Sequence, residues 1–555
     1  MIGILVATLL IDKHNTNNSF QNEAKWANGG YYLIAALILM AVVWLYSKTR
    51  KQRQDASMKL YIICILAITL FTVVIQVIVS MWAPEIIGRY GDFASPATAA
   101  VDLANGTDLS DVGYLQKHPN NVNLTIMLSF LYRICRSWRM VIIVSSFFTT
   151  ISVLLMTYVT RKITGSRYTA LFINVLGHGL ISLAWRAFIP YSDILAMPFI
   201  IGMFAILYSG LSNRLKAPLI ALSGMIAAWI KITAVIPLIA IVLYYLIAKH
   251  PFHAFKQIIK QLKEKKFSSA RPTILSIFLV LLVIGGGLFT GRILKRYYHY
   301  SPGDNARGWQ YMFMVGQNNK NTGQTGGGGE HGKQWKKITK KYSTRDEQMK
   351  ACVDAALTWI KDRGIIGNIV FYTKALNVAY NDGSFHHVQP YQPEEVEHNF
   401  IYEFYYNEGK YHTTMAGVRQ VLWDMVLILL AVPLVMTLFK KKRNLLYLVF
   451  EMCILGITLY LFIFEGRSKY LFMYLPVYLA FAALLMGDSL KLLTKKSTGT
   501  GEEADSREIP QDMPDSETEP AGSNEPNETK KNNDPEVQDE QNDPDDQTEQ
   551  TEQKE

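Results

Sequence analysis

The sequence predicts an all-α polytopic membrane protein with about 11 transmembrane helices, an extracellular mixed loop subdomain and a disordered C-terminal tail. Half of the 555 residues are hydrophobic and only 18% are charged, which is too apolar for an ordinary soluble multidomain protein. Runs of about 17–23 apolar residues recur along the chain. Such runs match the ~20 residues that a helix needs to cross the hydrocarbon core of a bilayer.

The candidate spans are residues 31–47, 60–82, 139–159, 168–186, 194–210, 217–230, 233–249, 273–290, 417–439, 445–463 and 470–487. Two short helices that meet near Lys231 are preferred to one long helix over 217–249. A single helix would place the basic stretch 249–271 on the outside, against the rule that loops rich in Lys and Arg are cytoplasmic.

Basic loops orient the whole set of spans. They are 48–53, 161–167, 213–216, 249–271, 440–443 and 491–496. If each is cytoplasmic, the N-terminus lies outside and the C-terminus inside. Three segments then face outward: about 83–138, the turn 187–193 and a long loop of about 125 residues from 291 to 415. A loop of that length is expected to fold as a small subdomain.

The tail from Ser497 onward carries 20 of the 46 acidic residues and only 4 of the 56 basic ones. It has too little apolar surface to fold, and we expect a disordered cytoplasmic appendage. The rest of the chain is strongly basic, which in a membrane protein indicates contact with anionic lipid and not with nucleic acid. The four cysteines form neither a disulfide framework nor a metal-binding spacing.

Two carboxylates are expected at the outer mouths of spans. Asp92 stands in Tyr90-Gly91-Asp92-Phe93, after the second span, and Asp193 ends Tyr191-Ser192-Asp193 between two later spans. Charges at a membrane edge are costly, so a functional role is the first hypothesis. The plainer alternatives are a solvated or capping carboxylate for Asp92 and an N-cap for Asp193. Glu85 and Asp102 share the loop of Asp92.

Several motifs in order resemble a known family. They are Gly91-Asp92-Phe93, Tyr114-Leu-Gln-Lys-His-Pro-Asn-Asn121 before an amphipathic helix, Pro190-Tyr191-Ser192-Asp193, Phe313-Met-Val-Gly-Gln317, Asn381-Asp-Gly-Ser-Phe385, Glu465-Gly-Arg-Ser-Lys-Tyr470 and Pro476. The chain resembles, over roughly residues 60–490, bacterial polyprenyl-phosphate-sugar-dependent glycosyltransferases of the GT-C superfamily, in the protein O-mannosyltransferase-like branch. Phe93 stands where eukaryotic O-mannosyltransferases have Glu, so protein is only one acceptor class among several.

The resemblance implies a membrane-embedded active site on the outer face, with Asp92 as the general base. The donor would be a polyprenyl-phosphate-linked sugar, and a single displacement would invert the anomeric centre. Such transfer needs a carboxylate to accept the acceptor's proton and cations to stabilise the departing phosphate. We assign substrate binding to Asp193, Tyr191, Arg467, Lys469 and Tyr470, although Arg467 and Lys469 could also be interfacial anchors.

The implied domains are an N-terminal segment with an extra transmembrane helix (1–59), a GT-C-like catalytic core with the first outer loop (60–290), the extracellular subdomain (291–416), C-terminal transmembrane helices (417–496) and the tail (497–555). The expected location is the cell membrane. The partners are membrane lipid, the lipid-linked sugar and an extracytoplasmic acceptor, which is a cell-wall polymer, a glycolipid or a protein. No nucleic acid is expected, and the oligomeric state is open.

Competing interpretations remain. A transporter or flippase for a lipid-linked sugar is the main alternative, and a non-catalytic scaffold is another. No cofactor or metal site is assigned, and a divalent cation is left open; the polar loop holding His386, His387 and His398 is more simply solvated than metal-binding. The stretch from Gly327 to Lys333 lacks the Ser or Thr of a phosphate-binding loop. Three polar residues within spans suit either a proton path or helix packing: His178, Asp424 and Glu451.

Overall fold

The described part of the chain is built from α-helices with short 3-10 and π turns between some of them. The computed structural model describes residues 28–50, 55–82, 93–109, 112–249, 281, 285–286, 292–294, 296–318, 328–385, 399–405, 409–438 and 445–498. No strand occurs in these ranges. They all belong to the first of two compact units, Met1–Thr498, and the second is Gly499–Glu555. The predicted all-α class is confirmed for these ranges.

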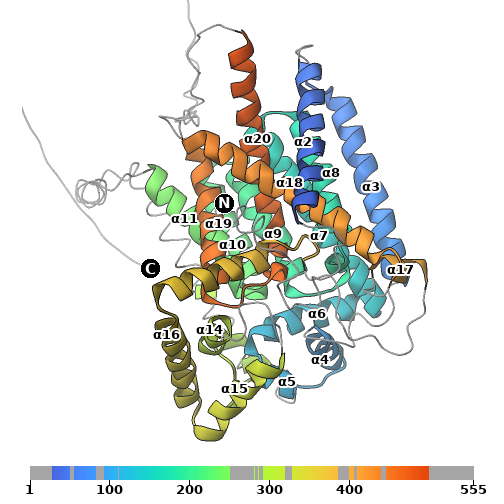
Figure 1. Cartoon of the computed structure of the whole chain (residues 1–555). Helices are drawn as coiled ribbons and strands as arrows, with labels where there is room; N and C mark the ends of the chain where they lie inside the picture. The colour runs from blue at the N-terminus through green and yellow to red at the C-terminus, as the bar shows by residue number, and fades with distance from the viewer. Residues whose placement is uncertain are drawn as a thin grey trace, which may run out of the picture. The chain divides into compact units, whose positions relative to one another are not determined.

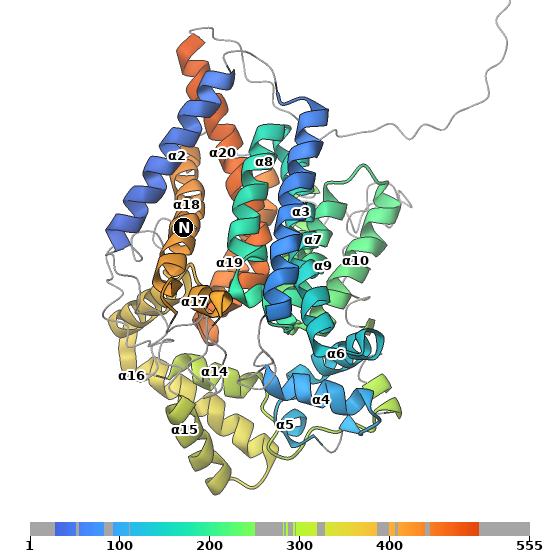
Figure 2. The same ribbon diagram turned by 90° about the vertical axis from the view of Figure 1, so that its right-hand side faces the viewer.

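Apolar helices form a bundle, which Figures 1 and 2 show from two sides. Their bounds are α2 Asn28–Arg50, α3 Met58–Trp82, α7 Trp138–Thr164, α8 Arg167–Gly177, α9 Ser192–Leu207, α10 Asn213–Ile230, α11 Val235–Lys249, α18 His412–Leu438, α19 Leu445–Ile463 and α20 Leu475–Thr498.

Within the described ranges, five helical segments are long and apolar enough to cross a membrane: Met58–Trp82, Trp138–Thr164, His412–Ala431, Leu446–Ile463 and Ser468–Gly487. Shorter apolar helices cover Gly30–Leu45, Ser192–Leu207, Leu215–Ile230 and Ile232–Tyr245. These segments coincide with predicted spans, as expected for a membrane protein. Most of the predicted span 273–290 lies outside the described residues, so the total of eleven crossings stays a prediction.

The predicted span 168–186 is wrong as a single helix. Helix α8 ends at Gly177 and continues as the π turn η4, His178–Ser182. There the Leu183 amide donates to the carbonyl of His178, five residues earlier, at 3.0 Å. The 3-10 turn η5, Trp185–Phe188, follows. This short helix and its irregular end place Arg186 in a turn before α9.

A buried glutamine joins three elements of the bundle. Gln76 of α3 is fully buried, and its Nε2 donates to Ser146 O at 3.1 Å, Thr149 Oγ1 at 3.0 Å and Ser182 O at 3.0 Å. Its Oε1 accepts from Thr150 Oγ1 at 2.8 Å. Because an amide in an apolar setting must find partners, this network fixes α3 against α7 and η4.

The stretch around Lys231 forms two helices, as preferred from the basic loops. Helix α10 ends at Ile230, Lys231 has extended backbone (φ −147°, ψ 113°), and the 3-10 turn η6, Ile232–Ala234, leads into α11. The interruption places a lysine at the junction of two apolar helices.

Further helices from two distant parts of the sequence gather at one end of the bundle (Figures 1 and 2). They are α4 Ala94–Ala104, α5 Gly113–Lys117, η3 Pro119–Asn121, α6 Val122–Cys135, α14 Trp309–Gln317, α15 Gly328–Lys341 and α16 Arg345–Tyr380. The Tyr300 hydroxyl donates to Leu115 O at 2.7 Å, and the Arg307 amide donates to Lys117 O at 3.0 Å. The first and third segments predicted to face outward therefore share one end.

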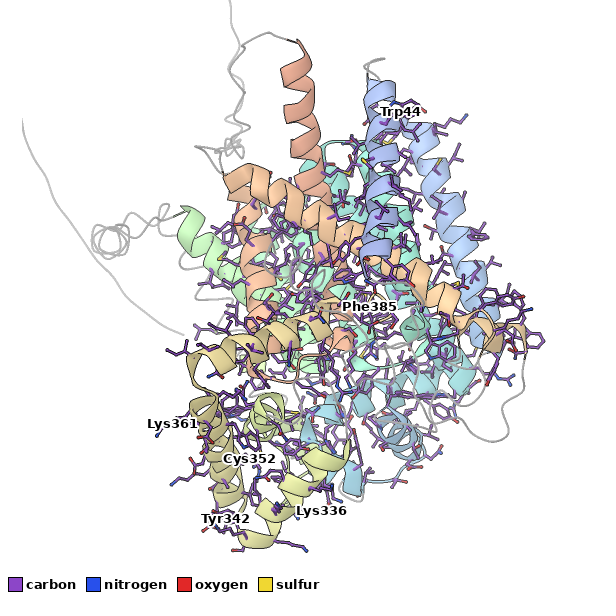
Figure 3. All side chains as sticks on the ribbon, viewed as in Figure 1. Trp44, Lys336, Tyr342, Cys352, Lys361 and Phe385 are labelled. Carbon is purple, nitrogen blue, oxygen red and sulfur yellow. The ribbon has the colours of Figure 1, made fainter. Side chains whose placement is uncertain are left out.

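The segment from Trp309 to Tyr380 has its own group of buried side chains, among them Met314, Trp335 and Cys352. Helix α16 starts with a capping box in which Thr344 and Glu347 bond reciprocally. It bends at Gly364, whose φ of +61° disfavours a side chain. In Figure 3, Lys336, Tyr342 and Lys361 lie on or beside α15 and α16, away from the bundle, whereas Phe385 lies among the bundle helices.

Candidate functional site

The proposed base, Asp92, lies outside the described residues, as do Tyr90, Gly91 and Glu85. The description resumes at Phe93, which occupies the N-cap position of α4. Asp102 lies in the last turn of the same helix. The catalytic role of Asp92 stays a prediction.

Asp193 is buried between two cations. It is 1% exposed and lies in the first turn of α9. One carboxylate oxygen meets Nη2 of Arg186 and the other meets Nζ of Lys231. The alternative reading of Asp193 as an N-cap is wrong, because Tyr191 occupies that position and the helix has no side-chain cap. Asp193 instead joins η5, α9 and the α10–α11 junction.

This cluster carries one carboxylate for two cations, so it has an excess of positive charge. Burying charges is costly, and each must be compensated by an opposite charge or a hydrogen bond. Burial lowers the pKa of the Lys231 ammonium, while the adjacent Asp193 carboxylate opposes that shift. The Nε of Arg186 is buried and has no hydrogen-bond partner in the described part of the chain. The cluster therefore retains capacity to bind an anion.

The loop between α19 and α20 lies beside this cluster. The Lys231 Nζ lies 5.5 Å from the centre of the Tyr470 ring, within the range of a cation–π contact. The Tyr470 hydroxyl donates to Glu465 Oε2 at 2.6 Å, and Arg467 Nε lies 2.6 Å from Glu465 Oε1. Lys469 Nζ lies 5.2 Å from the centre of the same ring.

Four of the five residues assigned to substrate binding are thus linked, with Lys231 and Glu465 as intermediates. They are Asp193, Arg467, Lys469 and Tyr470. The fifth, Tyr191, is partly buried and packs against both neighbouring apolar clusters of the bundle. It stands two residues before Asp193 and occupies the N-cap position of α9, but its side chain makes no capping hydrogen bond.

Sequence reasoning missed Arg186 and Lys231 as members of the site. The sequence places Arg186 at the end of a predicted span and Lys231 at the break between two predicted helices. The available signal was that each is an isolated basic residue within a long apolar stretch, which is costly unless it has a partner. The partner itself is 7 residues away from Arg186 and 38 away from Lys231, so only the fold identifies it.

A second buried carboxylate, Asp382, follows α16. Its Oδ1 accepts from the Ser384 amide at 3.0 Å, and its Oδ2 accepts from the Ser468 hydroxyl at 2.6 Å. Ser468 stands between Arg467 and Lys469 in the loop described above. The carboxylate also interacts electrostatically with the buried Arg419 of α18. Asp382 therefore joins the end of α16 to the loop between α19 and α20.

Gly383 permits a close approach between this motif and α18. A Cβ there would lie 2.7 Å from the carbonyl oxygen of Arg419, so any side chain would force the two segments apart. The Gly383 amide donates to Gln420 Oε1 at 2.9 Å, and Gln420 Nε2 donates to Asp424 Oδ1 at 2.7 Å. Asp424 thus has a structural bond within the bundle, as the packing interpretation expects.

The other polar residues within the predicted spans provide less evidence of a functional role. The His178 ring is buried, and its Nδ1 lies 3.2 Å from Ser182 Oγ. Across the ranges that the structure covers, no group of three or more His, Cys, Asp or Glu could hold a metal ion. The polar loop with His386, His387 and His398 lies outside those ranges.

Comparison with known proteins identifies the family. A family model described as a conserved hypothetical integral membrane protein matches residues 2–490. No curated protein and no solved structure matches the chain. The match covers the helical bundle and the charged cluster, and ends before the acidic tail.

Proposed function

Because this chain belongs to the family of conserved hypothetical integral membrane proteins, we propose a function exercised at the membrane: the protein transfers a sugar from a polyprenyl-phosphate donor to an extracytoplasmic acceptor. The acceptor is a cell-wall polymer, a glycolipid or a protein.

The observation that carries the proposal is the group of cations at one end of the bundle. Arg186 and Lys231 flank Asp193, and Arg467 and Lys469 belong to the adjoining loop. A polyprenyl phosphate places its apolar chain in lipid and its phosphate at the membrane surface. Buried or half-buried Arg and Lys beside apolar helices suit such a headgroup, because charge-assisted hydrogen bonds to phosphate are strong.

In the proposed reaction the acceptor hydroxyl oxygen attacks the anomeric carbon of the donor sugar. The Asp92 carboxylate takes the hydroxyl proton, and the bond between the anomeric carbon and the phosphate oxygen breaks. The electron pair leaves with the polyprenyl phosphate, whose developing charge the cations stabilise. One displacement inverts the anomeric centre.

Asp193 acts in this proposal by holding Arg186 and Lys231. Its two oxygens are each in contact with a cation, so the carboxylate is poorly suited to accept a proton from a hydroxyl. Asp193 is a positioning residue for the phosphate site, and the base is assigned to Asp92.

The test uses purified protein in proteoliposomes with radiolabelled polyprenyl-phosphate sugars. We expect the native chain to release or transfer label, and Asp92→Asn to lose that activity while inserting and folding normally, since the change keeps size but removes basicity. Asp102→Asn, in the following helix, is the matched control and should retain activity. Comparable turnover by Asp92→Asn would contradict the base assignment. Label that only changes leaflet, equally in both proteins, would indicate a flippase.

A further inference from the structure

Asn381 is a buried amide whose hydrogen-bonding capacity is unused. It is 3% exposed, and among the described residues neither its Oδ1 nor its Nδ2 has a hydrogen-bond partner. One turn earlier on α16, Asn377 is 1% exposed, and its Oδ1 also has no hydrogen-bond partner within the ranges that the structure covers. Buried polar groups are nearly always bonded, so a pair of unsatisfied amides needs an explanation, such as a molecule that bonds to them.

The two amides share one face of the helix, since residues four apart are neighbours there. The Asn381 backbone amide donates to the carbonyl of Asn377 at 2.8 Å, so helical geometry continues to this point. The unsatisfied groups comprise two carbonyl oxygens and one NH₂. They could accept two hydrogen bonds and donate others, a combination that matches hydroxyl groups, which do both. A phosphate, which chiefly accepts, would leave the two oxygens unsatisfied.

The segment that carries Asn381 is held firmly on both sides. On one side the Trp423 indole donates to the carbonyl of Tyr380 at 2.7 Å, and the Tyr380 hydroxyl bonds to that of Tyr478 at 2.7 Å. On the other side Asp382 accepts from Ser468. Rigid support of this kind is what a binding residue needs to hold its geometry.

The segment with Asn381 also lies next to the loop that carries two of the cations. Ser468, which bonds Asp382, stands between Arg467 and Lys469 in sequence, and Tyr470 of the same loop contacts Lys231. Asn381 is therefore one residue and one hydrogen bond away from the loop assigned to the donor phosphate, and Asn377 lies one helical turn further back. In a polyprenyl-phosphate sugar, the sugar hydroxyls are likewise separated from the phosphate by only the ring and the anomeric oxygen.

We propose that Asn381, together with Asn377, recognises hydroxyl groups of the donor sugar, and that Asp382 positions Asn381 for that contact. This inference rests on the proposed function, because it takes the neighbouring cations as the phosphate site. It assigns sugar selection to the end of α16, a segment distinct from the predicted base and from the cations.

The experiment measures the shift in melting temperature of the full-length protein on adding polyprenyl phosphate or polyprenyl-phosphate mannose, glucose or galactose. For the native chain we expect stabilisation by the phosphate alone and a further shift from at least one sugar. For Asn381→Leu we expect the phosphate shift to remain and the sugar increment to disappear, with donor KM raised about tenfold or more if transfer is measured. Without lipid its melting temperature should not fall, since the amide makes no bond that leucine would remove.

Asn174→Leu is the matched control. Asn174 is a fully buried amide on α8 with an unsatisfied Oδ1 and a bond from Nδ2 to Thr157 at 2.9 Å. Its replacement should lower stability and leave the sugar increment unchanged. Asn377→Leu provides a second variant of the proposed subsite and should reduce the increment.

Three results would overturn the inference. If Asn381→Leu and Asn377→Leu both melt well below the native chain without lipid, the amides are structural. If the native chain responds to polyprenyl phosphate and no sugar adds to the shift, the subsite is wrong while the phosphate site stands. If no lipid produces a shift, the proposed function fails and the subsite with it.

Discussion

In the cluster around Asp193, each buried charged side chain is tolerated only because an opposite charge lies beside it. A carboxylate that is 1% exposed could not stay ionised in an apolar bundle without Arg186 and Lys231 against it. The same two cations would be poorly tolerated without the carboxylate. The carboxylate and the two cations therefore depend on one another, and removing Asp193 would leave two buried cations without a compensating charge.

Asp193→Ala should destabilise the protein by about 3–5 kcal/mol, the range found when one member of a buried ion pair is removed. Thermal unfolding in detergent would measure the loss, with Asp354→Ala on the exposed surface of α16 as the control. Combining Asp193→Ala with Lys231→Met should recover part of the stability, because one of the two stranded cations is gone. A double variant less stable than the single one would contradict this account.

At the scale of elements, helix α14 determines where the loop between α19 and α20 begins. Gln317 Nε2 donates to Phe462 O at 2.8 Å and to Ile463 O at 3.0 Å, which are the last carbonyls of α19. Arg363 Nη1 in turn donates to Gln317 O at 2.8 Å from the bend of α16. Because the carbonyls at a helix end need partners, this contact fixes the end of α19 just before Glu465.

Gly316→Ala should disturb this junction. A Cβ at Gly316 would lie 2.4 Å from the carbonyl carbon of Phe464, which is backbone and cannot move as a side chain would. Overpacking of this kind costs about 1–3 kcal/mol, and it should also weaken binding of the lipid phosphate by displacing the loop.

Gly113→Ala in α5 is the matched control for that variant. A Cβ at Gly113 meets nothing within 4 Å, so its stability and lipid binding should stay close to native. The two variants are compared by melting temperature with and without polyprenyl phosphate. Equal behaviour would mean that α14 does not position the loop.

At the scale of the whole molecule, the charged cluster lies at the end of the bundle where α6 packs: Asn123 Nδ2 of α6 donates at 2.8 Å to the carbonyl of Trp229, two residues before Lys231. The basic loops predict that this end is extracytoplasmic, and the contacts between residues 115–118 and 300–307 place two of the predicted outer segments together. A site at that end would meet a lipid-linked sugar and an acceptor outside the cell.

Cysteine labelling tests the predicted sidedness. Asp354→Cys, exposed on α16, should react with a membrane-impermeant maleimide added to intact cells. Ser57→Cys, exposed before α3, should react only after permeabilisation. Cys352 and Cys453 are buried, and Cys64 and Cys135 are partly buried, so the native chain supplies the background. The reverse pattern would invert the topology and place the site in the cytoplasm.

Removal of residues 497–555 should leave turnover unchanged. The acidic tail lies beyond the family match, which ends at residue 490, and the cluster of cations lies wholly within the preceding unit. Activity of the shortened chain in proteoliposomes is the measurement. A large fall in turnover would show that the tail takes part in catalysis or folding.

Much of the bundle could be predicted because hydropathy is a local property. Helix α3 was expected at 60–82 and is found at Met58–Trp82, and the two helices around Lys231 follow from the sidedness of a basic loop. The predicted span 168–186 failed because the π turn at His178–Ser182 is equally apolar. A hydropathy pattern cannot distinguish an irregular turn from a continuing helix when both are buried.

By itself the sequence determined that this is a helical membrane protein with charged residues at the ends of its apolar helices, because burial of backbone and side chains in lipid constrains each segment separately. Only the tertiary structure decided which charges meet. Arg186, Asp193, Lys231 and Tyr470 come from four separate elements, and Asp382 reaches Ser468 across 86 residues. Ion pairs and hydrogen bonds act over a few ångströms in space, so their partners are set by the packing of the helices and not by position along the chain.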